Sequence, residues 1–182
     1  MIMMTSSVSA VAATIQIGKI SRLKMDIPDT WLLNNNAVKE GADGGSSVML
    51  QSTLNKNFLC LMTIVDLPTS RMTKKQLIDS LKDMDRKSIR ESVEKKITIV
   101  PLDIKNGHGA YYILTEAPVA GKESKEDNFK VKARFQIAYE YDVLITGSVL
   151  MGDANCAEFR QFLKSVSAMK PVREKPLKKS GK

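Results

Sequence analysis

The stretch TKKQLIDSLKDMDRKSIRESVEKKITIVPLDIKNGHGAYYILTE, from Thr73 to Glu116, places a charged segment before two apolar segments. Thr73 and Gln76 have the spacing of a capping box, in which each residue satisfies a free backbone group of the first helical turn. Apolar residues then recur every three or four positions, so one side of a helix can be buried while the others stay charged. The pattern predicts one amphipathic helix of about six turns, ending near Lys96, that covers a sheet.

A hairpin is predicted directly after this helix. Asn106-Gly107 readily takes the positive φ angles of a tight turn between two strands. The first of these strands contains Pro101, which cannot donate a ladder hydrogen bond, so that strand is expected at an edge or with a bulge. His108, the one histidine, lies between two glycines and is interpreted as an exposed turn residue without a partner for acid–base or metal chemistry.

The clearest strand runs from Phe129 to Tyr141, where apolar and polar residues alternate with period two. Lys130, Lys132 and Arg134 fall on its polar side, at intervals of about 6.6 Å. This basic row could contact an acidic partner, or it could protect an exposed sheet face or edge from pairing. We keep these three residues as candidate partner-binding residues.

The remaining elements complete an α+β pattern. Two short strands or one bulged strand are expected in 14–27, and a hairpin in 48–66 whose second strand, Phe58 to Asp66, is apolar enough to be covered on both faces. Another strand is expected over 143–151, and a final helix begins near Asn155 and Glu158, which have capping spacing. The fold class is therefore a mainly antiparallel sheet flanked by a long helix and a C-terminal helix, an αβα sandwich.

Trp31 is the one tryptophan and follows the turn Ile27-Pro28-Asp29-Thr30. At this position a tryptophan most often closes the end of a core, and the alternative is that it stacks on a ligand. It is the fourth candidate binding residue.

The charge of the chain is concentrated at its end. The net charge of +8 includes six Lys or Arg residues against Glu174 in residues 170–182, a tail that prolines and a glycine keep from forming a helix. Cys60 and Cys156 lack metal or redox spacing and are interpreted as buried thiols, with a disulfide between them as the alternative. No apolar run reaches the length of a membrane span.

The N-terminus resembles the later part of a secretory signal, since residues 1–13 are small or apolar and end in Ala10-Val11-Ala12-Ala13. No basic residue precedes this stretch, so a native flexible terminus is the alternative. The expected organisation is a signal remnant or disordered terminus at 1–13, a single domain at 14–169 and a disordered basic tail at 170–182.

The order of elements, the apolar-Pro-x-x-Trp step from Ile27 to Trp31, and the Asn-Gly hairpin with Tyr111-Tyr112 together resemble the PsbP-like superfamily. That superfamily includes PsbP, Mog-type and DcrB-type proteins and many exported bacterial proteins. The resemblance covers about residues 20–169 and implies a non-enzymatic accessory, binding or scaffold protein of the periplasm or exterior. A cytoplasmic location is the alternative.

The expected partner is a protein or a small ligand, and neither a cofactor nor a metal is expected. No motif of the superfamily transfers a functional residue to this chain. One alternative function is an anionic-surface or nucleic-acid binding module that uses the basic strand and the tail. Another is a hydrolase whose site forms only in the folded chain.

Overall fold

The computed structural model describes residues 9–17, 21–36, 45–66, 72–117, 129–140 and 143–173. The described elements form a seven-stranded sheet, a three-stranded sheet and three helices. Every strand pair is antiparallel. The predicted α+β class is confirmed.

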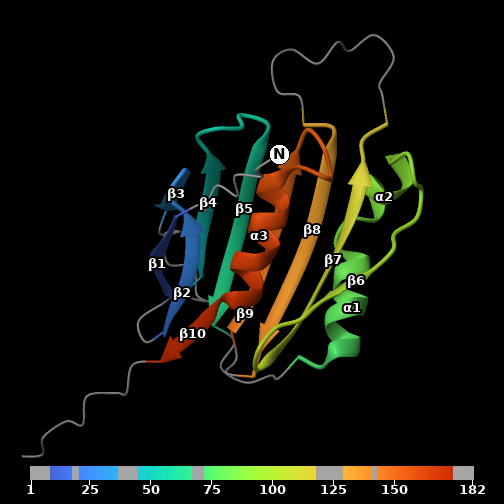
Figure 1. Cartoon of the computed structure of the whole chain (residues 1–182). Helices are drawn as coiled ribbons and strands as arrows, with labels where there is room; N and C mark the ends of the chain where they lie inside the picture. The colour runs from blue at the N-terminus through green and yellow to red at the C-terminus, as the bar shows by residue number, and fades with distance from the viewer. Residues whose placement is uncertain are drawn as a thin grey trace, which may run out of the picture.

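The larger sheet has the strand order β3-β4-β5-β9-β8-β7-β6 (Figure 1). Its strands are β3 (Trp31–Asn36), β4 (Ser46–Ser52), β5 (Phe58–Asp66), β6 (Val100–Leu102), β7 (Gly107–Thr115), β8 (Val131–Tyr139) and β9 (Val143–Met151). The predicted hairpins are present, and Asn106 has the positive φ of 60° that its turn requires. Pro101 lies in β6, which is an edge strand, as its missing N–H predicts.

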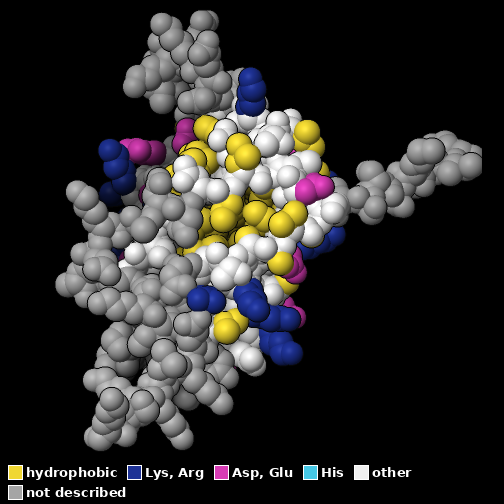
Figure 2. All heavy atoms as spheres, turned by 90° about the vertical axis from the view of Figure 1, so that its left-hand side faces the viewer, with side chains coloured by type: hydrophobic (Ala, Val, Ile, Leu, Met, Phe, Trp, Pro, Cys, Tyr) yellow, Lys and Arg dark blue, Asp and Glu magenta, His cyan; other side chains and the backbone are white. Residues whose placement is uncertain are grey.

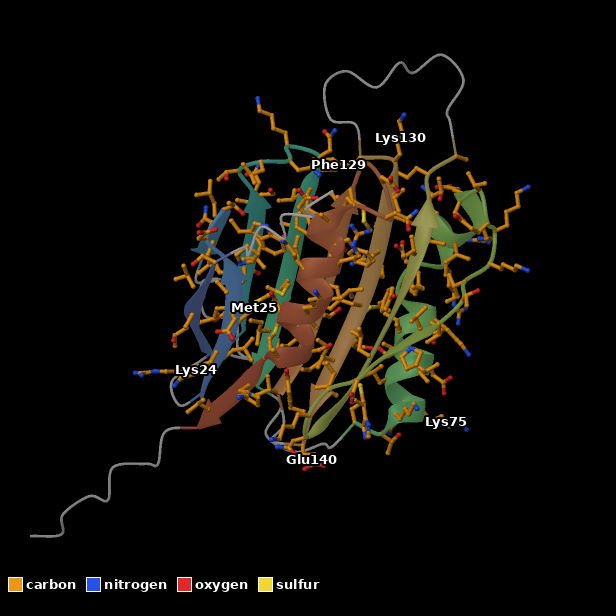
Figure 3. The ribbon with its side chains drawn as sticks, in the orientation of Figure 1. Lys24, Met25, Lys75, Phe129, Lys130 and Glu140 are labelled. Carbon is orange, nitrogen blue, oxygen red and sulfur yellow. The ribbon has the colours of Figure 1, made fainter. Side chains whose placement is uncertain are left out.

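One face of the larger sheet carries the main hydrophobic core. It is covered by α3 (Ala157–Ala168) and by the smaller sheet, which consists of β1 (Ala10–Ile17), β2 (Ser21–Pro28) and β10 (Lys170–Arg173) (Figure 1). The ring of Phe162 in α3 meets Phe135 of β8 at a centroid distance of 5.1 Å. Met25 points from β2 into this core, whereas the adjacent Lys24 points away from it (Figure 3).

The helix α3 begins one residue later than predicted. Its N-cap residue is Cys156, whose side chain makes no capping hydrogen bond. Asn155 lies one residue before the N-cap, in a local turn where its backbone N–H donates to Asp153 Oδ1 at 2.8 Å. The apolar stripe of the helix is confirmed, with Phe159, Phe162 and Val166 buried.

The opposite face of the larger sheet is covered in part by α1 (Lys74–Asp83) and α2 (Arg86–Glu91). The capping box of Thr73 and Gln76 is confirmed. Leu77 and Leu81 of α1 are buried in a second, smaller core that includes Tyr112 of β7. The prediction of one six-turn helix was wrong, because the helix breaks at Asp85, which leaves the helical conformation.

The described strands reach beyond the predicted domain limits of 14 and 169. Residues 10–13 belong to β1, where they pair with residues 25–28 of β2, and β10 extends the smaller sheet to Arg173. The predictions for residues 1–8 and for the tail from 174 onward lie outside the described residues. Among those described, no helix has the length and apolar character that crossing a membrane requires.

Gly147 of β9 is required by its neighbours in the core. A Cβ atom at this position would lie 2.5 Å from the Phe135 ring and 2.5 Å from the backbone oxygen of Leu61. We expect Gly147→Ala to destabilise the protein by about 1–3 kcal/mol through overpacking. Urea unfolding measures this loss, with Ser148→Ala, one residue along on the opposite face, as the control. Equal stability of both variants and the natural chain would contradict the assignment.

Candidate functional site

Asp85 brings together two of the predicted basic residues. Its Oδ2 lies 2.5 Å from Lys132 Nζ and 3.3 Å from Arg134 Nε. Lys132 Nζ also donates to Ser88 Oγ at 3.0 Å. The carboxylate comes from the junction of α1 and α2 and the two cations from β8, so these contacts attach the helices to the sheet.

The pKa of the Asp85 carboxyl is lowered from its ordinary value. Its burial alone raises this pKa, but hydrogen bonds with Lys132 and Ser88 and the positive charges of Lys132 and Arg134 outweigh that effect. The carboxylate is therefore ionised at neutral pH. Two cations share this single anion, which leaves one positive charge in the cluster uncompensated.

Two buried polar atoms lie on the same face of the sheet. The Tyr112 hydroxyl and Gln136 Oε1 have no hydrogen-bond partner among the described residues. The pKa of Tyr112 is raised to about 12, mainly by burial and also by the charge of Asp85, while the charge of Arg134 opposes both. Tyr112 therefore stays protonated at neutral pH and does not serve as a base there.

The structure separates the four predicted binding residues. Lys132 and Arg134 are half-buried and share Asp85, whereas Lys130 is exposed before the start of β8 (Figure 3). Trp31 is buried, and its ring centroid lies 5.0 Å from that of Phe58. The tryptophan thus closes one end of the core.

The strand β5 differs from the prediction that both its faces are covered. Its odd-numbered residues point to the face that bears α1 and α2, but these helices lie over β7 and β8. Leu61 is 44% exposed, and Thr63 is exposed as well. Among the described elements, none covers this half of the face, which β3, β4, β5 and β9 form.

A groove of about 430 Å³ lies on this uncovered half. The strand register places one row of residues straight across it: Arg134 opposite Ser148, Ser148 opposite Leu61, Leu61 opposite Met49, and Met49 opposite Asn34. A parallel row brings together the hydroxyl side chains Thr146, Thr63 and Ser47. The groove is therefore cationic at one end, apolar in the middle and lined by hydroxyls along one side.

A second hollow, of about 370 Å³, lies on the other side of the Asp85 cluster. Lys132 and Ser88 line it together with the carboxylates Glu91 and Glu116. Lys132 is already paired with Asp85, so this hollow has more negative than positive groups. Arg134, whose terminal nitrogens make no hydrogen bond within the described residues, lines the groove and not this hollow.

The edge formed by β1 and β3 also exposes apolar side chains, and Figure 2 shows hydrophobic atoms gathered on this side of the molecule. Leu32 of β3 is 60% exposed and Val11 of β1 is exposed too. Leu32 belongs to the face that carries the groove, since it pairs with Gln51, which lies two positions from Met49 on the same face of β4. The apolar surface of that face therefore continues to the edge strand.

The contact between Ser88 and Lys132 resembles the nucleophile and base of a hydrolase, but its electrostatics differ. A lysine that acts as a base must lose its proton, and Asp85 at 2.5 Å stabilises the charged ammonium form. His108 is exposed, and both cysteines are free thiols rather than a disulfide. Within the described residues, His, Cys, Asp and Glu form no group of three that could hold a metal.

We expect Asp85→Asn to lower the free energy of unfolding by about 1–2 kcal/mol at neutral pH, because two half-buried cations lose their anion. The pKa of Asp85 is lowered in the folded state, so its stabilising effect is complete above the unfolded pKa and is lost as the pH falls through the folded pKa. The gap between the two proteins should therefore close in acid. Urea unfolding from pH 7 to pH 3 measures it, with Asp83→Asn, in an exposed ion pair, as the control. A gap independent of pH would contradict the assignment.

Two tyrosines offer a matched comparison. Tyr139 is buried like Tyr112, but its hydroxyl donates to the backbone oxygen of Met169 at 3.3 Å. We expect Tyr139→Phe to cost about 1 kcal/mol, and Tyr112→Phe to leave stability unchanged or raise it by up to about 1 kcal/mol. Thermal unfolding of both variants measures the difference. Greater destabilisation by Tyr112→Phe would show that this hydroxyl has a partner.

No protein-family model matches the chain, and no curated protein matches its sequence. The structure is similar to the solution structure of cyanobacterial PsbP (CyanoP) from Synechocystis sp. PCC 6803, with a TM-score of 0.48 and 13% sequence identity. This match covers 92% of the chain described here and 95% of the cyanobacterial chain. At this identity the likeness transfers no functional residue, so the chemistry of the site comes from this chain's own side chains.

Proposed function

We propose that this protein is a non-enzymatic binding domain that holds a protein partner or a small ligand on the uncovered half of its larger sheet. The observation that carries the proposal is the groove of about 430 Å³ beside Arg134, on a face where Leu61 is 44% exposed. Leu32 of β3, which is 60% exposed, lies on the same face, and an exposed apolar surface framed by polar groups is typical of binding sites.

A binding role also fits the rigidity of the surface. The groove lies on β4, β5 and β9, whose backbones are hydrogen-bonded to neighbours on both sides. Its floor is therefore formed before a partner arrives, which lowers the entropy cost of binding. Among the described residues that line the groove, none forms a nucleophile paired with a base, which supports recognition rather than catalysis.

The basic row supports a nucleic-acid function less well. Lys132 and Arg134 share the Asp85 carboxylate beneath α1 and α2, so they do not form an exposed cationic ladder. Among the three, only Lys130 is exposed rather than half-buried. An exported location remains part of the proposal, on the grounds of the signal-like N-terminal composition.

Photo-crosslinking in the native host tests this surface. A photoreactive amino acid in place of Leu61 should form a specific adduct, whereas the same group in place of Val93, an exposed residue beyond α2, should not. Cell fractionation of the adduct tests the exported location. Equal adducts from both positions, or an adduct from position 93 alone, would contradict the proposed surface.

A further inference from the structure

We propose that the groove binds a small amphipathic carboxylate, with the carboxylate on Arg134 and the apolar body over Leu61 and Met49. This inference rests on the proposed function, because it uses the same uncovered face. It goes further by naming the chemical class of the ligand and the residue that recognises its charged end.

The cluster of Asp85, Lys132 and Arg134 has a net charge of one positive unit, which favours the binding of an anion at Arg134. Lys132 is occupied by Asp85 at 2.5 Å and by Ser88 at 3.0 Å. Arg134 contributes its Nε to Asp85 at 3.3 Å, and its two terminal nitrogens donate no hydrogen bond within the described part of the chain. A half-buried guanidinium gains most from a partner that accepts two hydrogen bonds together, and a carboxylate does so.

Asp85 also prepares Arg134 for this role. A long arginine side chain loses conformational freedom when it binds a ligand, and the contact of Nε with Asp85 restricts that freedom in advance. Only Nε is used in this contact, and the Arg134 side chain also lines the groove, so its terminal nitrogens remain available to a ligand. Asp85 is thus a positioning residue for the arginine.

The row of paired residues that crosses the groove starts with the polar Arg134 and Ser148 and continues with the apolar Leu61 and Met49. Neighbouring strands lie about 4.8 Å apart, so Leu61 is about 10 Å and Met49 about 14 Å from the Arg134 position. Ser148 lies between the arginine and the leucine. A ligand anchored by its carboxylate would therefore place its apolar part over Leu61 and Met49, and its far end near Asn34.

The position on the face of the sheet favours a small apolar body over a peptide. The backbone groups beneath the groove are already bonded within the sheet, so they cannot pair with the backbone of a peptide. A peptide would leave many of its polar groups without partners, at a cost that an apolar chain avoids. The volume of about 430 Å³ also falls in the size range of small-molecule sites.

Decanoate, a ten-carbon carboxylate, is a suitable probe for the full-length chain. Titration followed by ¹H–¹⁵N NMR should give saturable shifts in β4, β5 and β9. Arg134→Gln should weaken binding at least tenfold, and Arg134→Lys should restore part of it, because it returns the charge without the bidentate geometry. Lys130→Gln is the matched control, since it removes an exposed cation outside the groove, and it should bind as the natural chain does.

Two further measurements separate recognition of charge from general apolar contact. Ser148→Asp leaves Arg134 in place but puts a carboxylate opposite it, so this variant should lose decanoate binding even if Arg134→Gln disturbs the fold. Decyltrimethylammonium, which has the same chain length and the opposite charge, should not bind at this site.

The inference is overturned if decanoate gives no saturable shifts, if Arg134→Gln and Ser148→Asp both bind as tightly as the natural chain, or if the cationic amphiphile binds equally well. A specific adduct from position 61 without decanoate binding would retain the proposed surface and reject this ligand class. Decanoate binding that depends on Arg134, without an adduct at position 61, would retain the ligand site and reject a protein partner at it.

Discussion

The contact of Asp85 with Lys132 and Arg134 is the constraint on which one layer of the molecule depends. Lys132 and Arg134 of the interior strand β8 lie on the face opposite the main core, beneath α1 and α2. Burial of these two cations without an anion would be costly. The chain supplies that anion by breaking a helix, so α1 and α2 lie over β7 and β8. Because both helices are short, the layer ends over β9, where Met84 at the end of α1 contacts Thr146, and Leu61 of β5 stays exposed. The same ion cluster therefore fixes where α1 and α2 lie, and among the described elements none covers β4 and β5 on this face.

The two faces of the sheet consequently have different roles. The face beneath α3 and the smaller sheet carries the large aromatic and aliphatic side chains, with Phe162 of α3 against Phe135 of β8. The other face carries a small core under α1, then the ion cluster, then the groove. Stability comes mainly from the first face, which leaves the second free to carry side chains chosen for a ligand. Arg134 lies at the boundary of these two regions, since it contacts Asp85 in the ion cluster and also lines the groove.

Period-two alternation and turn chemistry predicted most of the fold from sequence. The strands of both central hairpins, the Asn106 turn and the Thr73 capping box depend on local patterns, and the structure confirms them. The helix break at Asp85 was missed because it depends on two cations that lie more than forty positions away in sequence. The exposure of Leu61 was missed for a similar reason, since apolar composition does not show whether another element covers a strand. Lys132 and Arg134 were singled out by alternation, but their anion and the groove are tertiary features.

The smaller sheet joins the beginning of the described chain to its end. Its central strand β2 pairs with β1 on one side and with β10 on the other, so that Lys24 lies opposite Lys170. During synthesis on the ribosome, β2 has only β1 as a neighbour in this sheet until β10, which begins at Lys170, has been made. Its second edge stays unpaired through that period, when it could pair with another nascent chain. Completion of the smaller sheet therefore waits for a strand that lies far from β2 in the sequence.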